Sequence, residues 1–284
     1  MHKKYENQTM PDEVRFNLVN EDIKNDAEVL RKLAEAKAKN ETLTGYCSSC
    51  EPNGDLIIDL SPNIKGVIPR NEVTYKVEKD GNVHKGKCES RVMMNVQFKV
   101  KEIKEEGEGI KVILSRKEAV EEVKRRYEKE LEKGMIVKGV VTGIQSYGAY
   151  VDIGGDVEGI ISVGNVSRVY LHDPSEILKV GQVVDVVIED IIKENGEIKL
   201  VLNRKVLLPT FQDIDKYFKQ GQTVPGRVKE IIDTGIFVEI CKDGVRFEGL
   251  AEFVPGRTFK YGDPVRVKIH SFNKSKEKLR LRIK

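Results

Sequence analysis

The sequence predicts a mainly β protein built from three tandem five-stranded barrels. Apolar and polar residues alternate, and Gly, Pro, Asn and Asp clusters interrupt these stretches about every 8–12 residues. Three strand ends are similar: residues 114–117 read Leu-Ser-Arg-Lys, 202–205 read Leu-Asn-Arg-Lys, and 281–284 read Leu-Arg-Ile-Lys. Their period of roughly 80 to 95 residues suits tandem small domains. The pattern fits a sandwich or a barrel, and we favour the barrel because closure leaves so few strands without exposed edges.

The chain divides into seven segments in this interpretation. They are a disordered tail (1–24), an N-terminal helix (25–40), a first barrel (41–116), a helical linker (117–132), a second barrel (133–204), a second helical linker (205–218) and a third barrel (219–284). In the second barrel the turn residues separate strands near 135–144, 148–154, 158–162, 182–191 and 197–203.

The three helical segments rest on apolar residues that recur at helical spacing. These residues are Val29, Leu30 and Leu33 in the first, Ala119, Val123, Tyr127 and Leu131 in the second, and Phe211, Ile214, Tyr217 and Phe218 in the third. Thr210, directly after Pro209, is the expected N-cap of the third helix. We expect the two linker helices to act as semi-rigid spacers.

Composition limits the possible functions. The 284 residues are 33% charged and 39% hydrophobic with a net charge of +3, so a surface that attracts a polyanion must be local. No apolar run approaches the roughly 18 residues of a membrane span, so we expect a cytoplasmic protein with no membrane partner. Four cysteines do not form a disulfide framework, which fits a reducing compartment.

An aromatic residue recurs on the expected outer face of two barrels. Residues 143–153 return as 230–240, so that Tyr150 matches Phe237. Strand alternation places Tyr150 with Asp152, and Phe237 with Glu239, opposite the apolar face. Because carboxylates are not expected in a small core, we place all four on the solvent side. Stacking of a base on such an aromatic contributes roughly 1–3 kcal/mol.

The third barrel carries the strongest positive charge. From Lys219 onward there are 15 basic and 8 acidic residues, against 7 and 10 in residues 133–204. Lys278, Arg280 and Arg282 alternate with apolar residues, so we expect them on the solvent side of the last strand, where they can contact phosphates. The alternative for both the aromatic and the basic residues is ordinary solvated surface.

Several segments of the second barrel together resemble a known RNA-binding module. They are Gly-Met-Ile-Val-Lys-Gly-Val-Val-Thr-Gly-Ile (134–144), Tyr-Gly-Ala-Tyr-Val-Asp (147–152), Gly-Ile-Ile-Ser-Val (159–163) and Leu-Val-Leu-Asn-Arg-Lys (200–205). This pattern resembles the S1 RNA-binding domain, named after the multi-repeat ribosomal protein of the bacterial small subunit. The third barrel is similar, and the first is similar only in outline. The resemblance implies a five-stranded OB-fold barrel that binds single-stranded RNA.

The resemblance also implies where RNA contacts lie. The family face has two aromatics on the second strand, a histidine after the third, and an aspartate and a basic residue around the last turn. In the second barrel, Ser162, Lys193 and Glu197 stand at the last three places. In the third barrel, Thr234, Glu252 and Asn273 depart from the pattern. The RNA-binding candidates are Tyr147, Tyr150, Ser162, Arg168, His172, Lys193, Lys199, Phe237, Asn273, Lys278, Arg280 and Arg282.

Two of these expectations have a stated alternative or exception. His172, with Tyr170 and Arg168, is expected to border the face of the second barrel, unless it is simply a solvated loop histidine. In the first barrel, Gly54 and Ile57 replace both aromatics, so its RNA face is expected to be absent. Protein docking, a role that the family's leading domains take on the ribosome, is expected there instead.

Two other motifs point to different chemistry. Cys47, Cys50, His84 and Cys88 are residue types that ligate zinc, although 34 residues separate the two pairs. Residues 81–88 nearly spell a phosphate-binding loop, but a charged stretch precedes them and no apolar helix follows. We therefore expect no cofactor, and a zinc site formed by these four residues stays the weaker alternative.

The sequence thus predicts a monomeric, non-enzymatic protein that binds single-stranded RNA, in particular mRNA, at the small ribosomal subunit. The alternative is a regulatory RNA and protein interaction module in transcription or RNA turnover, which the acidic Glu197 and Glu252 favour. A metal-sensing domain around Cys47 and Cys88 is a third possibility.

Overall fold

A computed structural model describes residues 26–79, 81–106, 109–194 and 197–284. These residues form three closed barrels of five strands each, with few helices, so the predicted mainly β fold class is confirmed. The tail expected at residues 1–24 lies outside the described residues. No helix among the described residues is both long and apolar enough to cross a membrane.

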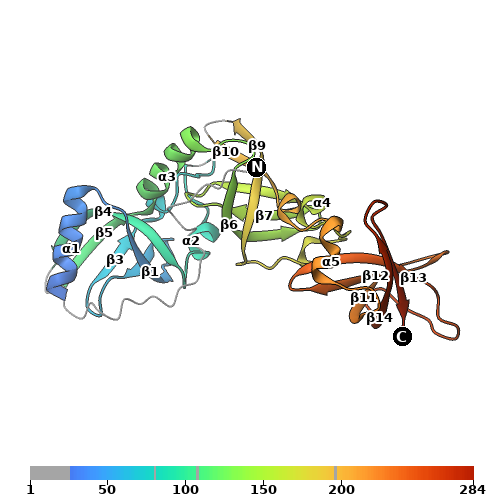
Figure 1. The fold of residues 1–284 in the computed structure, drawn as a ribbon. Helices are drawn as coiled ribbons and strands as arrows, with labels where there is room; N and C mark the ends of the chain where they lie inside the picture. The colour runs from blue at the N-terminus through green and yellow to red at the C-terminus, as the bar shows by residue number, and fades with distance from the viewer. Residues whose placement is uncertain (1–25, 80, 107–108, 195–196) are drawn as a thin grey trace. The chain divides into compact units, whose positions relative to one another are not determined.

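The first barrel follows the N-terminal helix α1 (Asp26–Lys39). Its strands are β1 (Leu43–Cys50), β2 (Leu56–Asp59), β3 (Lys65–Ile68), β4 (Asn95–Glu106) and β5 (Gly109–Ser115). Between β3 and β4 lie the short helices η1 (Arg70–Glu72) and α2 (Lys85–Glu89). Helix α1 lies beside β4 (Figure 1) and adds Val29 and Leu33 to the barrel core.

Helix α3 (Arg116–Glu130) leads into the second barrel. Ser115 caps it by accepting a hydrogen bond from the N–H of Glu118. The strands that follow are β6 (Ile136–Gln145), β7 (Gly148–Asp152), β8 (Glu158–Ser162), β9 (Val183–Glu194) and β10 (Glu197–Asn203). The one-turn helix α4 (Val163–Val166) and the 3₁₀ turn η2 (Pro174–Glu176) lie between β8 and β9.

The third barrel follows a connection that contains only short helical turns: η3 (Lys205–Leu207), η4 (Phe211–Asp213) and α5 (Ile214–Tyr217). Its strands are β11 (Thr223–Ile232), β12 (Gly235–Lys242), β13 (Val245–Ala251), β14 (Pro264–Asn273) and β15 (Lys278–Ile283). The helix expected to begin at Thr210, after Pro209, is present as the two consecutive short turns η4 and α5. Thr210 does form a capping box with Asp213.

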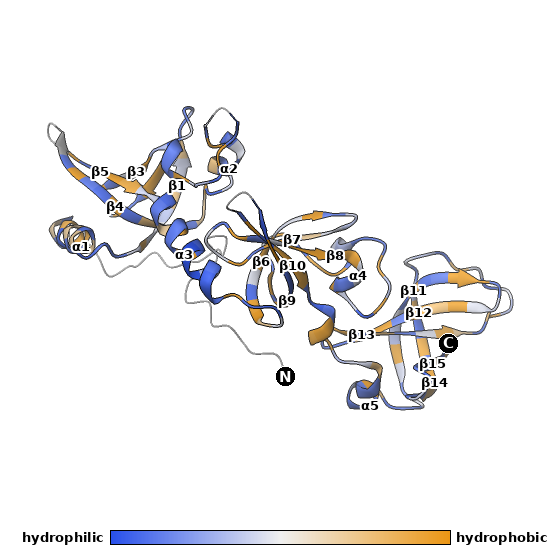
Figure 2. Cartoon of the chain, turned by 90° about the horizontal axis from the view of Figure 1, so that it is seen from above, coloured by the Kyte–Doolittle hydropathy of each residue, from blue (hydrophilic) through white to orange (hydrophobic). Residues whose placement is uncertain are grey.

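All three barrels share one topology. The strand order is 1-2-3-5-4, and the first strand closes the barrel by pairing with the fourth. Third and fifth strands run parallel, whereas the other paired strands are antiparallel. In Figure 2 the strands change between hydrophobic and hydrophilic colours along their length, as expected for a barrel with one face toward the core.

A glycine in the third strand of each barrel allows a leucine of the fifth strand to fill the core. A Cβ at Gly159 would lie 2.5 Å from Leu202, and one at Gly249 would lie 2.6 Å from Leu279. A Cβ at Gly66 would meet Leu114. These glycines are therefore required by close packing and not by backbone conformation.

The described residues fall into two compact units. The first extends to Ser162 and includes Pro174–Asn203, so it holds the first two barrels. The second combines Val163–Asp173 with Arg204–Lys284 and holds the third barrel.

Candidate nucleic-acid interface

One row of outward-facing residues occupies the same register in each barrel. It crosses the second, third and fifth strands, and we call it the outer stripe. In the second barrel Tyr150 pairs with Ile160, and Ile160 pairs with Val201. All three are half-buried, whereas their sequence neighbours Val151, Ile161 and Leu202 fill the core. The aromatic ring therefore has an aliphatic surface beside it.

The outer stripe of the third barrel ends on a positive charge. Phe237 pairs with Leu250, which pairs with Arg280. Arg280 is exposed, whereas Val201 stands at the same place in the second barrel. A ring and a guanidinium group on one face suit a stacked base and its phosphate.

In the first barrel the outer stripe is aliphatic throughout. Ile57 pairs with Val67, and Val67 pairs with Ile113. Gly54, the other position that replaces an aromatic, lies in the β1–β2 turn with a φ of 97°. Neither position offers a π face for stacking.

Two carboxylates that were expected to face solvent are buried. Asp152 is 3% exposed and Glu239 is 6% exposed, so placing them on the solvent side was wrong. Asp152 accepts a hydrogen bond of 2.6 Å from the N–H of Gly154. Glu239 forms an ion pair with Arg246 on the neighbouring strand. Each carboxylate is tolerated because its lone pairs are used locally.

Tyr147 and Tyr150 form a joint aromatic surface. Their ring centroids lie 6.4 Å apart at 86°, and their hydroxyl oxygens are 2.7 Å apart in a hydrogen bond. That bond raises the pKa of Tyr150. Tyr147 is 56% exposed, so one ring of the pair is open to stacking from solvent.

The other candidates of the second barrel separate into two groups. Ser162 is two residues from Ile160, and Lys199 two from Val201, so strand alternation puts both on the side of the outer stripe, where both are exposed. Lys193 instead donates a 3.0 Å hydrogen bond to the carbonyl of Glu128 at the end of α3.

Arg168 and His172 belong to the second compact unit, whereas Tyr147 and Tyr150 belong to the first. Arg168 donates its Nε–H to the carbonyl of Leu208 at 2.9 Å. The His172 ring packs edge-on against Tyr170 and Tyr261, with centroids at 5.0 and 5.4 Å. His172 is thus grouped with residues of the third barrel's unit and not with the tyrosine pair.

The basic residues of β15 share one side of the third barrel. Lys278, Arg280 and Arg282 are exposed, and the residues between them are buried, as the alternation predicts. Asn273 accepts hydrogen bonds from the Ser275 hydroxyl and the Lys276 N–H, and so shapes the turn that leads into β15. Its observed contacts are structural.

The cysteines and His84 do not form a metal centre. Among the described residues, no three His, Cys, Asp or Glu side chains are grouped to hold an ion. Nδ1 of His84 accepts the N–H of Gly86 as the cap of α2. Burial raises the pKa of Cys47 to about 12 and that of Cys88 to about 11. Burial thus favours the protonated thiol over the reactive thiolate at both positions.

Comparison with known proteins agrees with this geometry. The model of the S1 RNA binding domain matches residues 130–202 and 217–284, which contain the second and third barrels. The chain contains two domains of the S1 RNA-binding domain family.

Curated relatives of this S1-domain chain include two ribosomal proteins. Small ribosomal subunit protein bS1 of Staphylococcus haemolyticus is 30% identical over 243 residues, which cover 81% of this chain and 58% of the relative. The protein of the same name from Mycolicibacterium smegmatis is 29% identical over 269 residues, covering 89% and 52%. The chain thus spans just over half the length of the curated relatives it matches.

Among solved structures, GSP13 of Bacillus subtilis is 30% identical in the matched region. The match covers 28% of this chain and 62% of the GSP13 chain, with a TM-score of 0.26.

Sequence reasoning missed the aliphatic members of the outer stripes. Aliphatic residues are ordinary strand formers and carry no functional signal of their own. The missed residues are Val67, Ile113, Ile160, Val201 and Leu250. Their signal was available in principle, since each lies on the outward side of a strand with buried neighbours.

Proposed function

We propose that the protein binds single-stranded RNA through the outer stripes of the second and third barrels. The observation that carries this proposal is the equivalent register of Tyr150 and Phe237 in two domains that match the S1 RNA-binding model. Bases stack on the two rings, and each stacked base contributes roughly 1–3 kcal/mol.

The phosphates interact mainly with the third barrel in this proposal. Lys278, Arg280 and Arg282 form an exposed basic row, and Arg280 ends the stripe that begins with Phe237. The second barrel offers Lys199, which lies 3.8 Å from Glu194 and is thus partly neutralised. The second barrel therefore supplies stacking, and the third barrel supplies stacking and charge.

The proposed setting is translation at the small ribosomal subunit in the cytoplasm, with mRNA as the bound strand. The support is the similarity of the chain to small ribosomal subunit proteins bS1. The proposed role is binding alone, with no chemical step.

Replacing Tyr150 and Phe237 together by alanine tests the stacking. We expect the free energy of oligo(U) binding to become less favourable by a few kcal/mol, because two stacked bases lose their aromatic partners. Fluorescence anisotropy at fixed salt measures the affinity. Ile57→Ala, the same register position in the first barrel, is the matched control and leaves affinity unchanged. Tyr150→Phe retains the ring and most of the affinity. Equal affinity of the double variant and the parent would contradict the proposal.

The second candidate is a regulatory module that binds protein more than RNA. The observation in its favour is the acidic balance of residues 133–204, with 7 basic and 10 acidic residues. Co-sedimentation from lysate separates the two candidates. Association with small subunits supports the ribosomal role, whereas recovery with polymerase or nuclease and not with ribosomes supports the regulatory one.

A further inference from the structure

A cavity of about 430 Å³ lies within the first compact unit, between the segment that joins β3 to β4 and the second barrel. Val73 and Met94 of the first barrel and Val141 and Val180 of the second give it apolar walls. Hydroxyl groups of Thr74, Ser90 and Thr142 also line it. Its size and mixed lining match sites that hold small organic groups, which usually occupy roughly 300–1,000 Å³. We call it the composite pocket.

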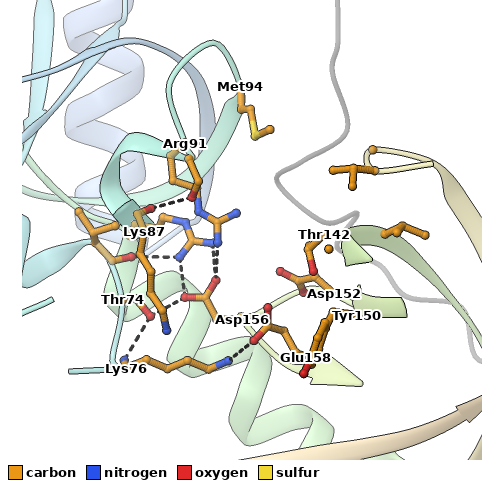
Figure 3. A pocket seen from close by; sticks show the side chains of 17 residues that line it. Thr74, Lys76, Lys87, Arg91, Met94, Thr142, Tyr150, Asp152, Asp156 and Glu158 are labelled. Atoms are coloured by element: carbon orange, nitrogen blue, oxygen red, sulfur yellow. Dashed lines mark hydrogen bonds and ion pairs between the residues drawn. The ribbon is translucent and has the colours of Figure 1, made fainter. Parts of the chain in front are cut away.

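The two walls are held together by buried charges. Arg116 donates to both carboxylate oxygens of Asp156, at 2.7 and 2.8 Å. Arg91 donates to Oδ1 at 3.2 Å, and the Thr74 hydroxyl donates to Oδ2. Figure 3 shows Arg91 and Thr74 reaching Asp156 from the first barrel. The pocket is therefore preformed, and a ligand need not order it.

The composite pocket is continuous with the proposed RNA surface. Tyr150, the aromatic residue of the second outer stripe, is also one of its lining residues. In Figure 3 the ring lies beside Glu158 on the side of the second barrel. An RNA strand with one base stacked on Tyr150 would thus bring its next nucleotide to the pocket.

The first barrel supplies basic side chains around this pocket. Lys76, Lys87 and Arg91 all line it, and Lys87 is exposed on α2. Lys76 lies 3.2 Å from Glu158, and Arg91 balances Asp156, so their charges are used within the protein. Lys87 is therefore the side chain best placed to approach a phosphate.

We propose that the composite pocket binds one nucleobase of single-stranded RNA, next to the base stacked on Tyr150, while Lys87 contacts a phosphate. This inference rests on the proposed function and adds a binding site that includes the first barrel. The first barrel, whose own stripe is aliphatic, takes part in RNA binding through the β3–β4 segment instead.

The first test compares two lysines of α2 in the full chain. Lys87→Ala is expected to reduce the slope of log K against log salt by about 0.7, the value for one lost contact to a single strand. Lys85→Ala leaves the slope unchanged, because Lys85 pairs with Glu89 and does not line the pocket. Equal slopes for the parent and the two variants would overturn the phosphate contact.

The second test compares two exposed valines of the second barrel. Val180, 65% exposed, lines the pocket, whereas Val183, 43% exposed, does not. Val180→Glu is expected to lower oligo(U) affinity about tenfold, near the low end of the range for a lost base contact. Val183→Glu adds the same charge outside the pocket, so it is expected to change the oligo(U) affinity by less than about twofold. Equal losses in both would mean that charge alone acts, and would overturn the pocket.

Photocrosslinking locates the base directly. Oligo(U) containing 4-thiouridine is expected to crosslink to the peptide of residues 85–94. Crosslinks confined to the third barrel and to second-barrel residues that do not line the pocket would refute the pocket and leave the proposed function intact. If the double variant Tyr150→Ala, Phe237→Ala also binds oligo(U) with the affinity of the parent, the proposed function fails as well. Failure of the pocket and failure of the proposed function are therefore distinguishable.

Discussion

Asp156 is a buried carboxylate at the β7–β8 turn, and its charge is balanced from the first barrel. Burial alone raises the pKa of Asp156, but Arg116, Arg91 and the Thr74 hydroxyl outweigh burial and hold it well below the ordinary value. The Tyr75 hydroxyl also lies 3.3 Å from the Gly155 carbonyl. The same turn thus receives side chains from several positions of the first barrel.

Asp156→Ala is expected to lower the free energy of unfolding by about 3–5 kcal/mol, because it leaves Arg116 buried without its carboxylate. A depressed pKa contributes stability that is fully present above the unfolded value of about 3.9 and is lost as pH falls below it. Urea unfolding at several pH values measures the effect.

Asp156→Asn is the matched variant for this pH dependence. The stability gap between parent and Asp156→Asn should be constant above about pH 5 and shrink below about pH 4. A gap that grows on acidification would show that the carboxylate is not stabilised by its arginines.

A related arginine has a different partner in the second unit. Arg116 donates to the carbonyl of Val73, and Arg204 donates in the same way to Val166. Arg204 has Arg246 nearby instead of a carboxylate, and burial followed by this like charge lowers the pKa of Arg204. Arg204 therefore has the same type of backbone contact as Arg116 but a neighbouring arginine in place of the carboxylate.

At the scale of the strand, the third-strand glycines set how closely the barrel closes. Gly159→Ala is expected to destabilise the protein by about 1–3 kcal/mol, because the new methyl group overlaps Leu202 and overpacks the core. Thermal unfolding of the full chain measures the loss.

Gly164→Ala is the control, since nothing lies within 4 Å of a Cβ there and the residue is helical. It should be neutral or slightly stabilising. Similar destabilisation by both substitutions would refute the packing explanation.

Strand positions followed directly from alternation, as β8 at Glu158–Ser162 illustrates. The expected exposure of Asp152 and Glu239 was wrong, because a local N–H and a neighbouring arginine satisfy these carboxylates within the fold. Both errors come from partners that periodicity does not encode.

At the scale of the whole chain, salt dependence reports where the phosphates lie. Replacing Lys278, Arg280 and Arg282 by alanine should reduce the slope of log K against log salt by about 2, because three contacts to a single strand are lost. RNA titrations at several salt concentrations measure it.

The control for this prediction removes the same charge elsewhere. Lys32, Lys37 and Lys39 of α1, replaced by alanine, should leave the slope unchanged. If the α1 variant changes the slope as much as the β15 variant, general charge and not the third barrel governs binding.

The aromatic positions of the candidate interface could be predicted, since Tyr150 and Phe237 repeat at equal spacing in the sequence. The composite pocket could not, because it needs Thr74 of one barrel beside Asp156 of the next, 82 residues apart. Pairing at that separation leaves no periodic trace in the residues between them.

The Asp156–Arg116 ion pair also limits how this chain could be rearranged. Tandem domains are often treated as units that can be exchanged, deleted or reordered. Here the acid belongs to the second barrel, and the base follows the last strand of the first. A recombinant that kept only one of the two barrels would carry half of a charge pair at a former contact. The junction between these two repeats therefore depends on their being kept together in this order.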